Sequence, residues 1–133
     1  GKVITFEKNE KHFEILKKNL DLSHFSDRVE LRNEELNGQT EVVSCSSIIL
    51  DLPEPQVLVK WAEESLVLGG KILCYVPTIN QVENLLTALN GWSEIEINEM
   101  IHRTWQPKIE AVRPNTNILG HTGFIVSARI LSK

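Results

Sequence analysis

The chain has 133 residues, of which 41% are apolar and 24% charged, and its formal net charge is −4. This composition fits one folded domain and excludes a disordered or fibrous chain, while an acidic balance disfavours a dedicated nucleic-acid-binding module. The apolar runs are too short to cross a bilayer and no signal peptide opens the chain, so we expect a cytoplasmic protein with no membrane contact. Cys45 and Cys74 match neither a disulfide framework nor a zinc pattern.

The sequence predicts short strands and one helix in residues 1–50. Val3–Phe6 is an apolar run closed by Glu7, and residues 12–22 carry apolar side chains near helical spacing. Val29–Arg32 alternates apolar and polar residues, which is typical of an edge strand. Residues 47–50 form a continuous apolar run, which predicts a fully buried strand.

The rest of the chain continues this alternation. Residues 55–68 repeat apolar side chains at helical spacing, and Gly69-Gly70 predicts the end of that helix. The remaining predicted elements are a strand at 71–76, a helix at 80–89, a strand at 94–101, a polar hairpin excursion at 102–121 and a strand at 123–130. Strands separated by helices of this length indicate βαβ units. We therefore predict an α/β fold with a mostly parallel sheet and an antiparallel C-terminal strand pair.

The segment Asp51-Leu-Pro-Glu-Pro55 follows the predicted buried strand. Ligands of open α/β sheets bind beyond the carboxyl ends of the strands, where Asp51 is expected to lie. Pro53 and Pro55 restrict φ and cannot donate hydrogen bonds, so they end the strand and stiffen the turn. From the pattern alone, a substrate-facing carboxylate and a plain strand-to-helix connection with a capping acid explain the segment equally well.

Nine motifs stand in a recognisable order along nearly the whole chain. They are GKVITFE at 1–7, DLPEP at 51–55, LGGKILCYVP at 68–77, QV at 81–82, Glu99, Arg103, Trp105, RP at 113–114 and HTGF at 121–124. In this order they resemble the class I S-adenosylmethionine-dependent methyltransferases, and more closely the catalytic subunits of tRNA (adenine-58-N1)-methyltransferases, the TrmI or Trm61 group. The resemblance implies a Rossmann-like methyltransferase sheet, S-adenosyl-L-methionine as cofactor, and methylation of N1 of an adenine in the T-loop of tRNA.

The glycine-rich cofactor loop of that family does not occur in these 133 residues. The resemblance therefore implies that 1–133 is the C-terminal part of a catalytic domain whose first strand and helix are absent. Backbone N–H groups of such a loop approach the cofactor, so the isolated chain is expected to bind the cofactor weakly and to be inactive. The alternative is a non-catalytic truncated relative that serves as an assembly or tRNA-binding module.

The resemblance also implies roles for individual residues. Glu7, at a strand end, is expected to bind the cofactor ribose, and Asn33 with Glu34 its adenine, although Asn33 is nearly as well explained as a turn residue. Asp51 is the expected catalytic residue and a further cofactor contact, because a carboxylate that accepts a hydrogen bond from the exocyclic amine of adenine makes N1 more nucleophilic. The expected substrate-binding residues are Pro53, Pro55, Tyr75, Gln81, Arg103, Arg113 and His121.

Some of these assignments keep an alternative. Tyr75 also fits core packing, Arg113 a brace of the hairpin, and His121 a structural histidine. The expected partners are tRNA and either further copies of the chain, as in the family's tetramers, or a paralogous subunit, with Trp105 as the best interface candidate. No grouping of His, Cys, Asp and Glu has metal-ligand spacing, so no metal is expected.

Overall fold

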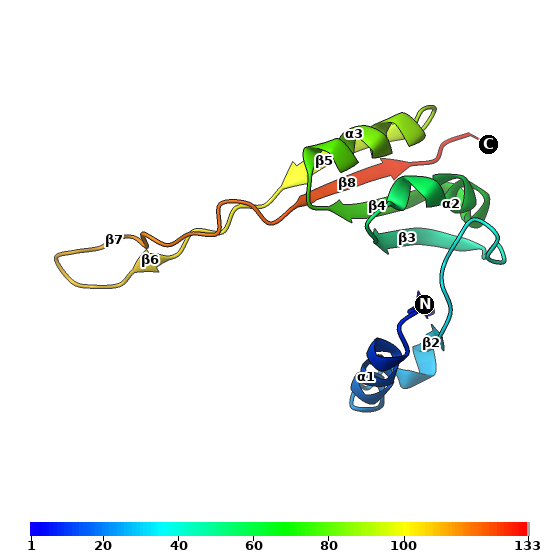
Figure 1. Ribbon diagram of the computed structural model, residues 1–133, viewed down its shortest axis with the longest axis horizontal. Coiled ribbons are helices and arrows are strands. Elements are labelled where there is room, and N and C mark those ends of the chain that lie inside the picture. The colour runs from blue at the N-terminus through cyan, green and yellow to red at the C-terminus, as the bar shows by residue number, and fades with distance from the viewer. Residues whose placement is uncertain (133) are drawn as a thin grey trace. The chain divides into compact units, whose positions relative to one another are not determined.

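The computed structural model describes residues 1–132 and divides the chain into two compact units, Gly1–Thr40 and Glu41–Lys133. Figure 1 shows the elements of both. Among the described residues, no helix combines the length and the apolar character that crossing a bilayer requires.

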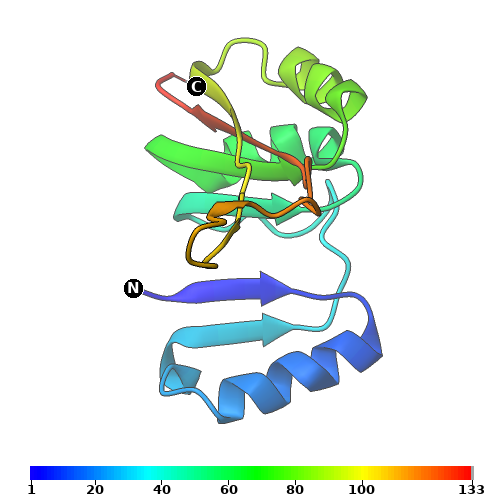
Figure 2. The same cartoon turned by 90° about the vertical axis from the view of Figure 1, so that its left-hand side faces the viewer.

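The first unit is a single βαβ crossover. Its elements are β1 (Val3–Phe6), α1 (Glu10–Asp21), the short 3₁₀ helix η1 (Ser26–Arg28) and β2 (Val29–Arg32). β1 and β2 pair in parallel, with Val3 opposite Val29 and Phe6 opposite Arg32, and Figure 2 shows these two strands in blue pointing the same way. The helix begins at Glu10 because the Asn9 side chain caps it, accepting hydrogen bonds from the backbone N–H groups of Lys11 and His12.

The second unit is a sheet with helices on one face. Its elements are β3 (Cys45–Asp51), η2 (Pro55–Leu58), α2 (Val59–Ser65), β4 (Leu66–Val76), α3 (Ile79–Ala88), β5 (Ser93–Glu99), β6 (Trp105–Gln106), β7 (Arg113–Pro114) and β8 (Phe124–Arg129). Within residues 41–132, four strands form one sheet in the order β3-β4-β8-β5. β3 and β4 are parallel, and β8 is antiparallel to both β4 and β5, so β3, β4 and β5 share one direction. The predicted mostly parallel α/β sheet with an antiparallel C-terminal pair is confirmed.

The core of this unit lies between the sheet and its two helices. Side chains alternate across a strand, so Ile72, Cys74 and Val76 of β4 face the same way, and all three are fully buried. Val126 of β8 stands opposite Cys74 in the register and is buried with it. The helices add a second layer of buried side chains, which includes Leu58, Trp61, Ala62, Val82 and Leu85.

The helix predicted over residues 55–68 is wrong in its last three residues. The 3₁₀ helix η2 is followed by the short helix α2, which ends at Ser65. From Leu66 onward the chain belongs to β4. Backbone pairing with the last strand explains the change, because Gly69 N–H donates to the Ile130 carbonyl at 2.7 Å and Ile130 N–H donates to the Gly70 carbonyl at 3.1 Å. The two glycines therefore continue a strand instead of ending a helix. Gly69 has φ of +81°, and a Cβ on Gly70 would meet the Val67 carbonyl oxygen at 2.7 Å.

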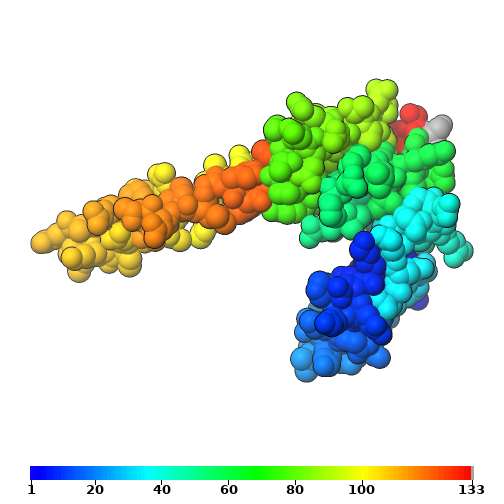
Figure 3. Space-filling view, in the orientation of Figure 1, coloured from blue at the N-terminus to red at the C-terminus, as the bar shows by residue number. Residues whose placement is uncertain are grey.

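The predicted hairpin excursion is present as a long arm, residues 100–123. β6 and β7 pair antiparallel near its middle, with Trp105 opposite Pro114 and Gln106 opposite Arg113. Figure 1 shows the arm leaving the sheet between β5 and β8, and Figure 3 shows it as a narrow projection from the second unit. Many of its apolar side chains face solvent, including Met100, Ile101, Trp105, Ile109, Val112 and Leu119.

Candidate active site

The first unit brings together two of the predicted cofactor residues at the carboxyl ends of its strands. Glu7 follows β1, and its N–H donates to the Arg32 carbonyl at 3.0 Å, which extends the ladder by one residue. The Asn33 side-chain amide donates to the Glu7 carbonyl at 2.8 Å. One carboxylate oxygen of Glu7 accepts the backbone N–H of Asn9 at 2.7 Å, which fixes the acid at the start of α1.

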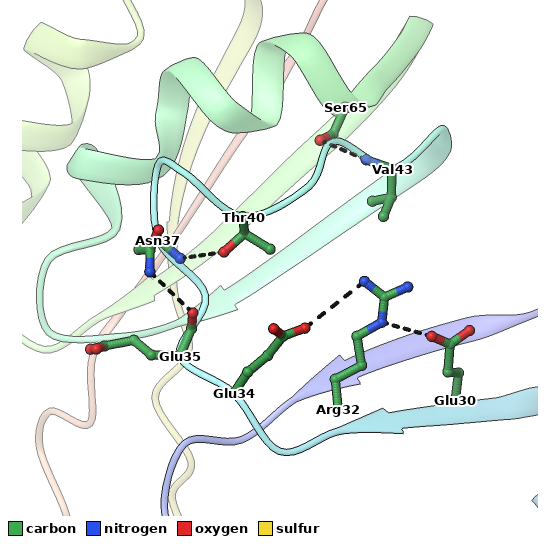
Figure 4. Close-up of polar contacts among 8 residues, drawn as sticks. All are labelled: Glu30, Arg32, Glu34, Glu35, Asn37, Thr40, Val43 and Ser65. Carbon is green, nitrogen blue, oxygen red and sulfur yellow. Dashed lines mark hydrogen bonds and ion pairs between the residues drawn. The ribbon is translucent and has the colours of Figure 1, made fainter.

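Glu34 lies one residue further along and takes part in an ion pair. Its carboxylate is 4.0 Å from a guanidinium nitrogen of Arg32, whose Nε donates to Glu30 at 2.7 Å (Figure 4). The Arg32 guanidinium also lies over the Phe6 ring, 5.4 Å from the ring centroid. Glu34 therefore belongs to a surface charge network, and its role toward a cofactor stays a prediction.

The second unit places Asp51 at the carboxyl end of β3, as predicted. In the described part of the chain its exposed carboxylate has neither a hydrogen bond nor an ion pair. Asp51 stands directly beside Tyr75 in the parallel β3–β4 register. Because Cys74 points into the core, both side chains lie on the face of the sheet opposite the helices.

The turn after Asp51 is held by a residue from α3. Gln81 Nε2 donates to the Pro53 carbonyl at 2.9 Å, while Gln81 Oε1 accepts the Thr78 hydroxyl at 2.6 Å and the Thr78 N–H at 3.1 Å. Thr78 and Gln81 thereby form a capping box at the start of α3. Gln81 thus braces the turn, and Pro55, which is buried at the start of η2, shapes the same turn from inside.

Gln81→Ala is expected to lower the free energy of unfolding by about 1–2 kcal/mol, because it removes both the helix cap and the bond to the turn. Gln81→Glu is the matched variant: it keeps the acceptor of the capping box and loses only the donor to Pro53. We expect Gln81→Glu to cost about half as much in urea denaturation. Equal losses for both variants would show that the bond to Pro53, and not the cap, stabilises this region.

Tyr75 is half-buried and tied to the start of β8. Its hydroxyl donates to the Thr122 carbonyl at 2.5 Å. A Cβ on Gly123 would lie 2.6 Å from both Cζ and Oη of the Tyr75 ring, so only glycine allows the ring to rest on the backbone here. Tyr75 is therefore not a buried core residue, but its ring is fixed by Thr122 and Gly123, and it forms a wall beside Asp51.

His121 is enclosed by acceptors. Its Nδ1 lies 2.5 Å from Glu99 Oε1 and its Nε2 lies 2.7 Å from the Pro77 carbonyl oxygen. The Pro77 carbonyl, and after it the Glu99 carboxylate, raises the pKa of His121 above its usual range. Both ring nitrogens are already bonded, so the predicted contact with RNA would require this arrangement to open.

Arg103 and Arg113 do not join Asp51 and Tyr75. Both are exposed on the arm, which Figure 1 shows extending far from the sheet, and neither makes an ion pair with any residue from 1 to 132. Arg113 braces the hairpin only through the backbone pairing of β6 with β7. The assignment of Arg103 and Arg113 to substrate binding stays a prediction.

The thiol of Cys74 takes no part in this site. It is fully buried, and burial raises the pKa of Cys74 to about 12. Its place on the core face of β4 explains the burial, which excludes a thiolate nucleophile at neutral pH. Among residues 1–132, no group of three His, Cys, Asp or Glu side chains is arranged to hold a metal ion.

Three residues of the site were missed by the reasoning from sequence. Glu99 and Gly123 were noted only as parts of motifs, and Thr78 was not singled out. The Thr78-x-x-Gln81 spacing is a capping-box signature that precedes an apolar helix, so the role of Thr78 could have been predicted from the sequence. Glu99 and Gly123 gain their roles from strand neighbours, which one sequence does not reveal.

The chain matches a known protein family over most of its length. Residues 1–112 match the family described as the tRNA methyltransferase complex GCD14 subunit. The tRNA (adenine(57)-N(1)/adenine(58)-N(1))-methyltransferase TrmI of Methanocaldococcus jannaschii is 38% identical over 86 residues, which cover 62% of this chain and 30% of that protein. The catalytic subunit TRM61 of a Candida albicans tRNA (adenine(58)-N(1))-methyltransferase is 32% identical over 122 residues, covering 85% of this chain and 36% of that protein.

Solved structures agree with this match. The tRNA (m1A58) methyltransferase TrmI of Aquifex aeolicus superposes with a TM-score of 0.88 at 28% identity, over 100% of this chain and 55% of that one. A SAM-dependent O-methyltransferase of Thermotoga maritima gives a TM-score of 0.91 at 27% identity, over 100% of this chain and 51% of that one. The chain thus spans about a third of the length of these curated relatives and about half of the solved ones.

Proposed function

Since the chain belongs to the tRNA methyltransferase complex GCD14 subunit family, we propose that residues 1–133 are the C-terminal part of a catalytic domain that methylates N1 of an adenine in tRNA. The observation that carries this proposal is Asp51, an exposed carboxylate at a strand end beside Tyr75. The turn that follows it is held by Gln81 and Pro55, so the carboxylate stands on a rigid support.

The residues after β1 and β2 suit the nucleoside half of S-adenosylmethionine. Glu7 offers a carboxylate that can accept ribose hydroxyls: one oxygen accepts the Asn9 N–H, and the other lies 3.8 Å from His12 Nδ1, beyond hydrogen-bond distance. Asn33 uses its amide nitrogen on the Glu7 carbonyl, which leaves Oδ1 as an acceptor for an adenine amine. When bound, the cofactor supplies an electrophilic methyl group on a sulfonium centre. The donor set of the first unit therefore fits the cofactor that the family uses.

Asp51 would act on the target base. The exocyclic amine of adenine donates a hydrogen bond to the carboxylate. This bond increases the electron density on the amine and on N1, so N1 becomes a better nucleophile. Methylation leaves a positive charge on the ring, and the same carboxylate stabilises that charge as it develops. Tyr75, packed against Gly123, limits where the base can lie, so that orientation contributes to the rate.

The target atom determines how RNA must be presented. N1 lies on the Watson–Crick edge of adenine, so the base must be unpaired or extruded before it reaches Asp51. A net charge of −4 gives the chain little general attraction for RNA. Arg103 and Arg113 on the arm are the side chains that we assign to phosphate contacts.

A second subunit, either a further copy or a paralogue, completes this proposal. The arm carries exposed Met100, Trp105, Ile109 and Leu119, of which Ile109 is 87% exposed. Apolar side chains gathered on a projecting hairpin are typical of an assembly surface. The family description, which names a complex, supports the same reading.

The test is methyl transfer to a tRNA transcript by the gene product that carries these 133 residues. With labelled S-adenosylmethionine, we expect nuclease digestion and mass spectrometry to detect 1-methyladenosine. A transcript with guanine at the target position should remain unlabelled. The 133 residues alone are expected to be inactive. If the gene product bound tRNA but transferred no methyl group to it, the assembly or tRNA-binding module would be favoured instead.

A further inference from the structure

The base of the arm is closed by one histidine that joins three strands. Glu99 ends β5, where the chain leaves the sheet, and Pro77 follows β4. His121 lies where the chain returns, shortly before β8 begins, and its ring bridges the other two at 2.5 and 2.7 Å. The Phe124 ring packs against the imidazole, with centroids 4.9 Å apart.

The chemistry of the two partners determines the protonation of this ring. A backbone carbonyl can only accept, so Nε2 must carry a proton. Nδ1 faces the Glu99 carboxylate, and an ionised carboxylate, like a carbonyl, offers only acceptor oxygens, so Nδ1 donates to it. A ring that donates from both nitrogens is an imidazolium, and it satisfies both acceptors at once.

The two residues that follow His121 contact Tyr75 and so link the position of His121 to the candidate site. Thr122 accepts the Tyr75 hydroxyl, and Gly123 lies against the Tyr75 ring. Tyr75 in turn stands beside Asp51 in the β3–β4 register. Moving the segment 121–123 would therefore move the wall beside the carboxylate.

We propose that His121 is a positioning residue that acts as an imidazolium bridge between Glu99 and Pro77, closing the base of the arm and holding Tyr75 in place beside Asp51. The bridge itself follows from the geometry of His121. Its effect on methyl transfer rests on the proposed function.

The groups that face His121 from each packed element are few. β5 contributes the Glu99 carboxylate, the end of β4 contributes the Pro77 carbonyl, and β8 contributes the uncharged Phe124 ring. Tyr75 and His102 are two further titratable groups of this region, and within residues 1–132 neither bonds to the His121 ring. The Tyr75 hydroxyl proton is used on the Thr122 carbonyl, and His102 lines a pocket together with Thr122. Glu99 is therefore the one charged partner among these groups, and its removal is a clean test.

The expected pH dependence follows from the direction of the shift. The pKa of His121 is raised by folding, so the bridge contributes its full stability below the ordinary imidazole pKa of 6.5. That contribution disappears as the pH rises through the raised pKa of the folded state. The difference in unfolding free energy between wild type and His121→Gln should therefore be largest in mild acid and shrink in mild alkali.

Two labels report the bridge without an activity assay. In protein with ¹⁵N-labelled histidine, the His121 ring should show two protonated nitrogens and a titration midpoint above the ordinary imidazole value. Tyr75 is the only tyrosine, so ¹³C-labelled tyrosine gives one ring signal. We expect that signal to shift with the same midpoint as His121.

Glu99→Gln is the main variant, since it retains the size of the side chain and removes its charge. It should move the His121 midpoint to lower pH, whether that midpoint is read from the histidine signal or from the Tyr75 ring signal. His24→Gln, at an exposed histidine with no hydrogen bond or ion pair within residues 1–132, should leave both readings unchanged. In the gene product, His121→Gln should lower kcat about tenfold and leave KM for the cofactor unchanged, with Glu99→Gln shifting the alkaline fall of kcat to lower pH.

Either of two results would overturn the inference. One is a His121 titration midpoint that is the same in wild type and Glu99→Gln; the other is a Tyr75 ring signal that does not change as His121 titrates. Should the wild-type gene product transfer no methyl group, the proposed function fails, and these two signals still decide whether the bridge exists.

Discussion

Asp51→Ala is expected to lower kcat for methyl transfer by about 10²–10⁴-fold, the usual range for removing a group that assists proton movement or stabilises developing charge. Its carboxylate has no protein partner among residues 1–132 and is exposed, so the folded state gives up little when it is removed. We expect the unfolding free energy to stay within about 0.5 kcal/mol of wild type. Single-turnover methyl transfer to tRNA, run beside urea denaturation, measures both quantities.

Glu54→Gln is the matched control for this variant. Glu54 is an exposed acid in the same turn, and its replacement changes the net charge by the same amount. We expect it to retain nearly full activity, because the proposed chemistry depends on a carboxylate at the strand end and not on the acidity of the turn. Equal losses for Asp51→Ala and Glu54→Gln would point to general electrostatics and remove Asp51 from the catalytic role.

The position of Asp51 could be predicted because it depends on local rules. An apolar run followed by Asp and two prolines has few interpretations other than a strand that ends in a rigid turn, and the structure has that arrangement. The βαβ crossover of the first unit follows from the same kind of evidence. In both cases the residues that determine the element lie within it or next to it.

The failed prediction at Leu66–Leu68 has a tertiary cause. The apolar spacing of this segment continues that of α2, so periodicity alone favours helix. Pairing of Leu66 with Cys45 and of the Gly69-Gly70 backbone with Ile130 overrides that preference. Strand pairing of this kind joins residues far apart in the chain, and neither partner carries a local signal for it.

The bridge at His121 was beyond prediction for a similar reason. His121 is 22 residues from Glu99 and 44 from Pro77. The three meet only because β8 enters the sheet between β4 and β5. The sequence predicted an antiparallel last pair of strands but did not indicate where β8 would insert. The HTGF motif marked the position without revealing its partners.

Gly123→Ala is expected to damage the same wall from the backbone side. An added Cβ would lie 2.6 Å from Cζ and Oη of Tyr75, closer than real Cβ contacts come, and the planar phenol group that carries both atoms cannot bend away. The ring must rotate or the strand must shift, and either movement strains the hydrogen bond to Thr122. Overpacking at a buried site costs about 1–3 kcal/mol, and we expect kcat to fall at least about tenfold. Urea denaturation and steady-state methyl transfer measure the two effects.

Gly120→Ala is the control, because a Cβ there meets no atom within 4 Å. A double-mutant cycle with Tyr75→Ala then identifies the cause of the Gly123→Ala defect. If the clash with the ring is responsible, Gly123→Ala should cost almost nothing in stability once the ring has been removed, giving a coupling energy of about 1–3 kcal/mol. Additive losses would instead place the defect in the β8 backbone, and Tyr75 would no longer explain why this position requires glycine.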